Sequence, residues 1–143
     1  FPQTIVLSGV AMCHEWPDFW PANCPPEDAE PPDCEVYYYV RRNPPGKGDC
    51  KPRRGPNSQR CFDYECMACG LSVYPTREAA LECREAVPGF RRLYVAKATL
   101  EPHHGVMKMT PSAASSMHHT WWVAIGIDPR RLFTIVQGPQ VTN

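Results

Sequence analysis

Prolines and cysteines crowd the first half of this chain and constrain what it can fold into. Ten of the 17 prolines lie between Pro17 and Pro56, and proline lacks the N–H group that helices and sheets need. A segment with so few backbone hydrogen bonds requires another restraint, and disulfides supply one by limiting the freedom of the unfolded chain. The eight cysteines available for this purpose are Cys13, Cys24, Cys34, Cys50, Cys61, Cys66, Cys69 and Cys83.

The even number and wide spacing of these cysteines predict a secreted, extracellular protein stabilised by disulfides. Their connectivity stays open, because spacing alone does not decide it. We expect Cys66 and Cys69 to bond other cysteines rather than each other, and Cys83 to tie a helix to a loop. In this interpretation the protein needs no metal ion and no cofactor.

The segment Cys66-Met67-Ala68-Cys69-Gly70 supports a second interpretation. Two thiolates at this spacing, followed by glycine, are typical of a zinc knuckle, and a tetrahedral site needs two more ligands. No second CxxC motif is present to provide them. The alternative is therefore an intracellular interaction protein with one structural zinc, whose ligand set would be Cys61, Cys66, Cys69 and Cys83.

Composition and charge exclude several classes of protein. Hydrophobic residues make up 43% of the 143-residue chain and charged residues 21%, as in ordinary globular proteins. No apolar run approaches the roughly 18 residues of a membrane-spanning helix. The formal net charge is zero, so no overall basic field favours nucleic acid as a partner.

The balanced charge conceals two blocks of opposite sign. Residues 1–35 carry seven acidic side chains and no Lys or Arg, whereas residues 36–60 carry seven basic side chains against Asp49 alone. Such blocks can pair within one chain or between copies of it, or form a solvated, partly self-neutralised surface, because exposed ion pairs contribute little.

The pattern of apolar residues and turn signals predicts an α+β fold in a single domain, 1–143. We expect a Cys- and Pro-rich, loop-dominated half over residues 1–70, and one packing helix with antiparallel strands over residues 71–143. The core would be a sheet built from residues 92–137, covered by the first half. The predicted helix spans 76–87, and about six short strands are drawn from 4–10, 35–42, 71–74, 92–100, 105–110, 118–127 and 132–137.

Alternation within these strands predicts which side chains share a face. In strand 35–42, Tyr37 and Tyr39 point away from the face that carries Val36, Tyr38 and Val40. Strand 118–127 is apolar on both faces, as a central strand is, so its adjacent tryptophans, 121 and 122, face opposite sides.

Two pairs of histidines, 103–104 and 118–119, suggest a catalytic alternative. If strands 105–110 and 118–125 form a hairpin, one histidine of each pair could meet across its mouth. Two imidazoles beside a lysine can act as base, acid and charge stabiliser in phosphodiester cleavage. The alternative is then a small secreted nuclease, a metal-independent phosphodiesterase or ribonuclease, using His104, Lys108 and His119.

The loop Thr110-Pro111-Ser112 precedes a strand that begins His118-His119-Thr120. This arrangement resembles that of small ADP-ribosyltransferase-like toxins, and the resemblance implies a secreted toxin. The nicotinamide-binding arginine and the catalytic glutamate of that family are not placed on this sequence.

Aromatic and charged loops favour binding over catalysis. Exposed aromatic rings present rigid surfaces that suit sugars, proline-rich peptides or protein partners. We therefore expect a secreted binding or self-assembly module whose partner is an extracellular protein, a glycan or another copy of the chain, and whose contacts come from loops 14–33 and 41–60. The candidate binding residues are Trp16, Trp20, Tyr37, Tyr39, Arg41, Arg42, Arg53 and Arg54.

Overall fold

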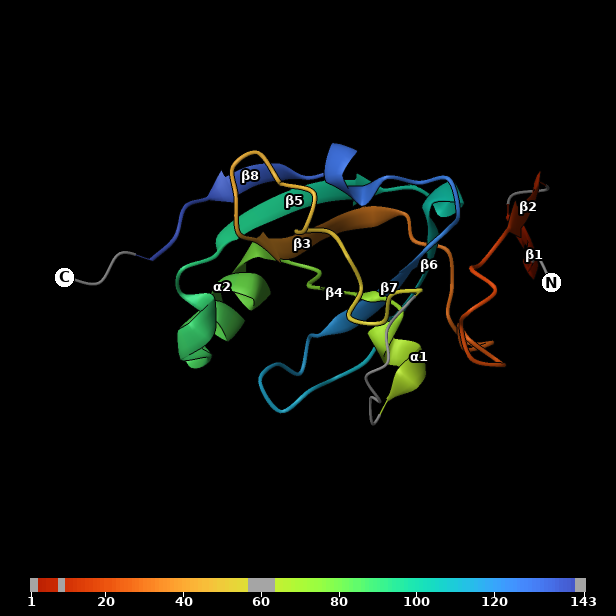
Figure 1. Ribbon diagram of the computed structural model, residues 1–143, viewed down its shortest axis with the longest axis horizontal. Coiled ribbons are helices and arrows are strands. Elements are labelled where there is room, and N and C mark those ends of the chain that lie inside the picture. The colour runs from red at the N-terminus through yellow and green to blue at the C-terminus, as the bar shows by residue number, and fades with distance from the viewer. Residues whose placement is uncertain (1–2, 8–9, 57–63, 141–143) are drawn as a thin grey trace.

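The computed structural model describes residues 3–7, 10–56 and 64–140. Within these residues, two antiparallel sheets of three strands each form the body of the protein (Figure 1). The first sheet has the order β3 (Cys34–Val40), β5 (Tyr94–Leu100) and β8 (Thr134–Gln137). The second has the order β4 (Leu71–Val73), β7 (His119–Val123) and β6 (Gly105–Met109). The predicted α+β class with antiparallel pairing is confirmed.

Short helices and a two-stranded ribbon complete the described fold. The α-helices are α1 (Glu65–Ala68) and α2 (Arg77–Ala86), and single 3-10 turns are η1 (Pro88–Phe90), η2 (Pro102–His104) and η3 (Pro129–Arg131). The ribbon pairs β1 (Gln3–Leu7) with β2 (Val10–His14). The sequence predicted one strand over 4–10; the structure instead ends β1 at Leu7 and begins a second strand at Val10. No helix in the described part of the chain is long and apolar enough to cross a membrane.

The strands of residues 92–137 divide between the two sheets, so the prediction that they form one sheet is wrong. β5 and β8 belong to the first sheet, and β6 and β7 to the second. Strand β3 does not merely cover a sheet, because it pairs with β5 along its whole length, from Cys34 opposite Leu100 to Val40 opposite Tyr94. The reason is that both faces of β3 are apolar and need burial.

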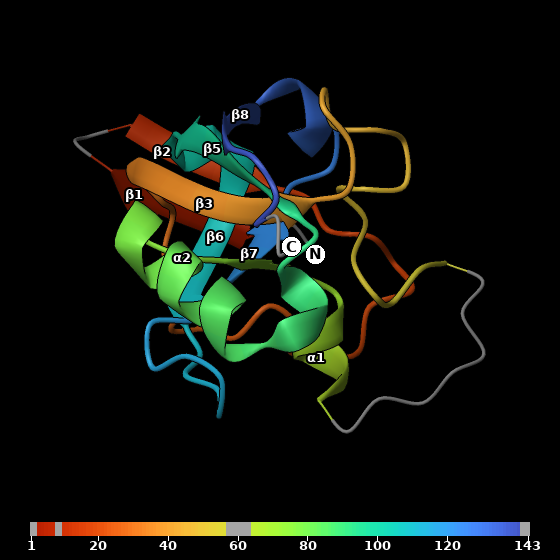
Figure 2. The same ribbon diagram turned by 90° about the vertical axis from the view of Figure 1, so that its left-hand side faces the viewer.

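The alternation predicted for β3 is confirmed by its packing. Val36 and Val40 are buried between the two sheets, where they share a core with Leu71, Leu100 and Trp121. On the opposite face, Tyr37 and Tyr39 pack in the cluster beneath α2. Figure 2 shows α2 lying along this outer side of β3.

Helix α2 begins as its sequence predicts. The Thr76 Oγ1 accepts a hydrogen bond from the Ala79 N–H at 3.0 Å, which caps the first turn. Ala80 and Cys83 are buried against Val95 of the first sheet. The predicted packing helix, 76–87, is therefore confirmed within one residue at each end.

The acidic loop that follows β2 covers the outer face of the second sheet. Trp122 is fully buried there with Ala29 and Val106, on the side of β7 opposite Trp121. A disulfide joins Cys24 of this loop to Cys66 of α1. The prediction that Cys66 bonds another cysteine than Cys69 is confirmed.

The other described cysteines depart from the expected disulfide framework. Among the residues that the structure describes, four have free thiols: Cys34, Cys50, Cys69 and Cys83. Burial raises the pKa of the Cys69 thiol to about 11, and Cys83 lies in the core beneath α2 rather than in a bond to a loop. The predicted pairings of Cys13 and Cys61 fall on side chains outside the described residues.

Candidate functional site

A cleft of about 640 Å³ lies where the loop after β3, helix α2 and the loop between β6 and β7 meet. Three basic side chains line it, those of Arg41, Lys51 and Arg53, together with His118. We call this site the basic cleft. The loop after β3 and the loop between β6 and β7, which are far apart in sequence, thus line the same concave surface.

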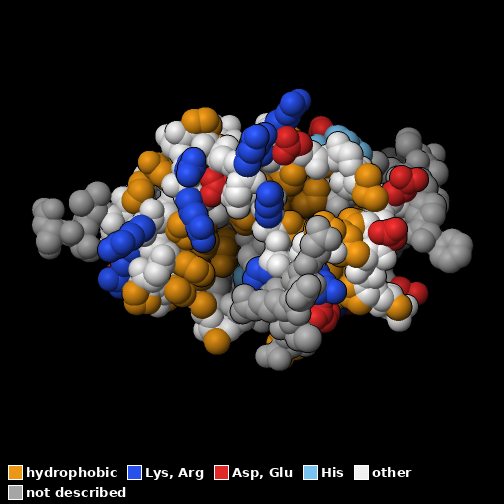
Figure 3. All heavy atoms as spheres, viewed as in Figure 1, with side chains coloured by type: hydrophobic (Ala, Val, Ile, Leu, Met, Phe, Trp, Pro, Cys, Tyr) orange, Lys and Arg blue, Asp and Glu red, His pale blue; other side chains and the backbone are white. Residues whose placement is uncertain are grey.

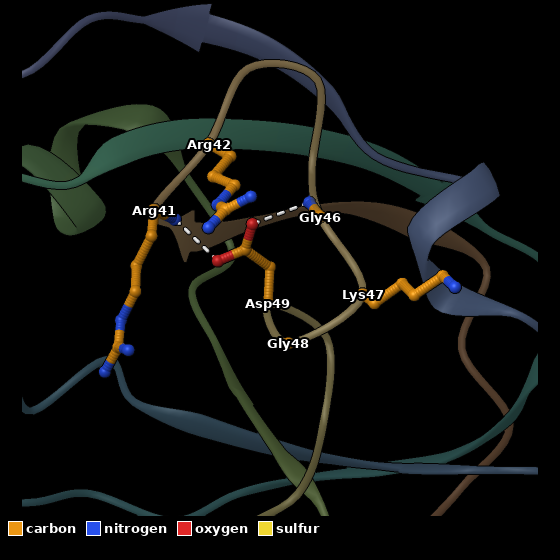
Figure 4. Close-up of a pocket in the computed structure, with 6 residues that line it drawn as sticks. All are labelled: Arg41, Arg42, Gly46, Lys47, Gly48 and Asp49. Carbon is orange, nitrogen blue, oxygen red and sulfur yellow. Dashed lines mark hydrogen bonds between the residues drawn. The ribbon is translucent and has the colours of Figure 1, made fainter.

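The loop after β3 is held in shape by Asp49. Its two carboxylate oxygens accept hydrogen bonds from the Arg41 and Gly46 N–H groups, each at 2.7 Å, as Figure 4 shows. The Tyr38 hydroxyl donates to the Asp49 carbonyl at 2.6 Å. Because both carboxylate oxygens accept backbone hydrogen bonds, Asp49 fixes the shape of the loop. The cleft is lined by three cationic side chains and by this one carboxylate.

His118 enters the cleft in a defined orientation. Its Nδ1 lies 2.9 Å from the Thr110 carbonyl and 3.0 Å from the Thr110 hydroxyl, which in turn bonds the Thr120 hydroxyl at 2.8 Å. A carbonyl only accepts, so Nδ1 carries the hydrogen. In the neutral ring, Nε2 is then left as an acceptor.

The pKa of His118 lies below its ordinary value of 6.5, chiefly because burial disfavours the charged ring. The positive charges of His119 and Arg53 lower this pKa further, against the opposing effect of the bond to Thr110. At neutral pH, His118 is therefore an uncharged imidazole beside a cationic loop.

Aromatic rings form the wall of the cleft on the side of α2. Tyr39 packs against Tyr74 and Phe90, with ring centroids 5.3 and 5.1 Å apart. The Tyr39 hydroxyl donates to the Ala80 carbonyl, and the Tyr74 hydroxyl lies 3.4 Å from the Cys83 sulfur. Since these hydroxyls are already engaged, Tyr39 and Phe90 supply ring surface to the cleft, and Ser72 supplies a hydroxyl group. The Ser112 hydroxyl is engaged with the Ser115 backbone.

The three residues of the catalytic alternative do not come together. The hairpin of β6 and β7 is confirmed, but its register sets Met109 opposite His119 and Gly105 opposite Val123. His104, just before Gly105, is thus about four strand residues, roughly 13 Å, from the end that carries His119. The side chain of Lys108 is paired with Asp28 at 2.7 Å.

His104 has a structural role. It is buried in η2, and its Nδ1 accepts the Glu101 N–H at 2.9 Å. Burial lowers its pKa, and the charge of His103 lowers it further. His103, His104 and Glu101 are the one group in the described part of the chain that could gather three metal-ligating atoms. His103 and His104 lie at the end of the hairpin of β6 and β7 that is away from the basic cleft.

Five of the eight candidate binding residues lie outside the basic cleft. Tyr39, Arg41 and Arg53 line it. Arg42 lines an adjoining pocket on the same loop, which shares Arg41 and Asp49 with the cleft (Figure 4). Arg54 forms an ion pair with Glu65 at 3.7 Å. Tyr37 packs beneath α2. Trp16 and Trp20 line a different pocket, described below.

Sequence reasoning named the pair 118–119 but chose His119 for the site, and it did not single out Lys51 or Ser72. One signal was available: His118 and Thr120 are two apart on a strand, so they share a face, and Ser72 is the register partner of Thr120. What the sequence did not reveal is that the basic loop folds over this face.

The alternative zinc site is not assembled in the structure. Cys66 is bonded to Cys24, so its sulfur is not a thiolate. Cys69 and Cys83 are buried in different clusters, on the two sides of the fold. Cys61, the remaining ligand of that set, lies outside the described residues.

Comparisons of the chain with protein-family models, with curated proteins and with solved structures gave no match.

Proposed function

We propose that the protein is a secreted, extracellular binding module that takes a sugar bearing sulfate or phosphate groups into the basic cleft. The observation that supports this most is the convergence of Arg41, Lys51 and Arg53 on one concave site. Arginine presents a planar fork of donors that matches tetrahedral oxyanions, and lysine adds a point charge. The Cys24–Cys66 disulfide is compatible with an oxidising, extracellular compartment.

The remaining walls suit the rest of such a ligand. Tyr39 and Phe90, which are half-buried, offer apolar ring surface to the C–H face of a sugar, and the buried Tyr74 ring supports Tyr39 from behind. Ser72 is exposed and can exchange hydrogen bonds with sugar hydroxyls. The volume of about 640 Å³ falls within the usual range of ligand pockets.

Phosphodiester cleavage at the same site is a second candidate, favoured by one observation. The Nδ1 of His118 is held by Thr110, which leaves Nε2 as an acceptor able to take a proton. Among the described residues that line the cleft, His118 is the one imidazole. Since acid–base cleavage needs a proton donor as well as a base, binding is better supported than catalysis.

Reversing two charges of the cleft tests the proposal. The variant Arg41→Glu with Lys51→Glu should bind a sulfated oligosaccharide about 100-fold more weakly than the parent, because two charge-assisted contacts are lost and repulsion replaces them. Calorimetric titration with a sulfated oligosaccharide, chosen from a glycan array, and with its desulfated counterpart measures this change.

The matched control is Arg42→Glu with Lys47→Glu, on the same loop but outside the cleft. It makes the same change in net charge and should weaken binding less than about threefold at moderate salt. Equal losses in both variants would show a diffuse charge effect rather than a site. Failure of the parent to bind any sulfated or phosphorylated sugar would overturn the proposal.

Binding should also strengthen as the pH falls. A bound anion stabilises protonated His118, so the pKa of this group, lowered in the free protein, rises in the complex. The complex then takes up a proton between the two pKa values, and affinity should be about fivefold higher at pH 5 than at pH 7.5. Titrations of the same oligosaccharide across this range measure the effect, and His118→Gln should flatten it. An unchanged pH dependence in His118→Gln would contradict the assignment of His118 to the site.

A further inference from the structure

A second pocket, of about 800 Å³, lies at the end of the molecule away from α2 and combines indole rings with acids. Trp16 stacks on Trp20 with ring centroids 5.6 Å apart and planes at 18°, and His14 packs 5.4 Å from Trp16. Ile125, an exposed apolar side chain, completes the wall. We call this site the tryptophan pocket.

Three carboxylates border the tryptophan pocket: those of Glu15, Asp18 and Glu27. No Lys or Arg is among its described lining residues, and none of the three carboxylates forms an ion pair with a residue that the structure describes. Asp28, next along the chain, differs because Lys108 neutralises it at 2.7 Å. The pocket therefore carries acidic charge that the described fold leaves unneutralised.

Indole faces next to carboxylates recognise cations. A guanidinium or ammonium group gains from the electron-rich ring and from ion pairing at once. A sulfated or phosphorylated ligand is disfavoured here by like charge. The chemistry of the tryptophan pocket is thus opposite to that of the basic cleft.

The chain carries a matching cationic surface on the loop after β3. Arg42 and Lys47 are exposed, and neither forms an ion pair within residues 3–7, 10–56 and 64–140. Asp49 braces this loop through the Arg41 and Gly46 N–H groups. Arg42 and Lys47 line the same pocket of the loop, and in Figure 4 the Lys47 side chain extends away from Arg42 and Asp49.

The two surfaces do not meet within one molecule. In Figure 1 the loop after β3 rises past β8 and then descends in front of the first sheet, whereas the acidic loop lies at the end of the molecule beside the ribbon of β1 and β2. Figure 3 shows the Lys and Arg side chains of this face at its centre and left, with a few acids among them, whereas the coloured charged side chains toward its right end are Asp and Glu. Both surfaces are therefore exposed, and their opposite charges make them complementary to each other in a second copy.

We propose that the tryptophan pocket of one copy binds the loop after β3 of a second copy through Arg42 and Lys47. Because the two surfaces differ, the contact is head-to-tail, and each dimer keeps one free pocket and one free loop. A chain of zero net charge has no overall repulsion to oppose this contact. Since exposed ion pairs contribute little each, the association should be weak, with a Kd on the order of 10–100 μM.

Paired charge reversals test this contact by sedimentation velocity over a range of concentrations. The parent should gain average mass with concentration at low salt and lose it at high salt, because screening weakens such contacts. Asp18→Lys with Glu27→Lys makes the pocket basic, and Arg42→Glu with Lys47→Glu makes the loop acidic. All four side chains are exposed, so both variants should fold, and each alone should stay monomeric.

An equimolar mixture of the two variants is the decisive sample. The intact loop of the first variant faces the intact pocket of the second, so the mixture should associate at least tenfold more tightly than either variant alone. A salt-indifferent monomeric parent, or a mixture that stays monomeric, would overturn the proposal. So would a monomeric parent whose pocket binds an arginine-rich peptide, since the occupant would then be a different protein. The pocket variant should still bind the sulfated oligosaccharide, which keeps this test separate from that of the basic cleft.

Discussion

Replacing Cys24 and Cys66 together by alanine should lower the free energy of unfolding by about 3–4 kcal/mol. The disulfide joins residues separated by 42 positions, and closing a loop of this length restricts the unfolded chain strongly. The acidic loop that it holds contains six prolines between Pro17 and Pro32, so few backbone hydrogen bonds replace the lost restraint. For a domain whose total stability is typically about 5–15 kcal/mol, this is a large fraction.

Urea denaturation of the double variant and the parent measures the loss, with Cys34→Ala as the matched control. Cys34 is an exposed free thiol, and its removal should change the free energy of unfolding by less than about 0.5 kcal/mol. Cys24 lines the tryptophan pocket. Loss of the disulfide should therefore weaken self-association through this pocket more than it weakens ligand binding in the basic cleft. A double variant less than 1 kcal/mol below the parent would show that other contacts hold the acidic loop.

Local patterns in the sequence were sufficient to predict single elements. Period-two alternation assigned Val36 and Tyr37 to opposite faces of β3, because adjacent side chains of any strand point to opposite sides. Thr76 marked the beginning of α2, because a threonine hydroxyl caps the N–H groups that a helix leaves unpaired. These rules act over a few residues and need no knowledge of the rest of the fold.

The arrangement of the strands was not predictable in the same way. β4 and β6 both pair with β7, and nothing local in Leu71–Val73 specifies a partner about 50 residues ahead. Burial of both Trp121 and Trp122 required two separate covers, the first sheet and the acidic loop. The segments that cover a strand are distant from it in sequence, so local patterns do not identify them.

The candidate site was predictable only in part, for the same reason. Seven basic residues between 36 and 60 predicted a cationic loop, and Arg41 and Arg53 do line the basic cleft. Their partner is His118 rather than the pair His104 and His119, because the register of β6 and β7 separates those two. A shift of one residue along a strand changes the face on which a side chain lies, so adjacent histidines could not be told apart by pattern.

That register depends on Gly105, and Gly105→Ala should cost more stability than alanine at any other glycine that the structure describes. Gly105 has φ of +137°, and a Cβ there would lie 2.0 Å from the Trp122 carbonyl oxygen and 3.1 Å from the Ala124 nitrogen. Both neighbours are backbone atoms of the paired segment, so neither can rotate away. We expect a loss of at least about 3 kcal/mol in the free energy of unfolding, the upper end of what a strained backbone residue costs.

Gly126→Ala separates the two causes of this loss, which are backbone strain at positive φ and the clash of the added Cβ with the paired backbone. Gly126 also has positive φ, +93°, but a Cβ there meets nothing within 4 Å, so its substitution should cost only about 1–2 kcal/mol of backbone strain. Urea denaturation of both variants measures the difference, which reports the clash with β7. Because Thr110 and His118 flank the loop of the same hairpin, Gly105→Ala should also weaken binding of the sulfated oligosaccharide, whereas Gly126→Ala should leave it unchanged. Equal stabilities of the two variants would mean that β6 and β7 can shift apart without cost, and that their register does not position His118.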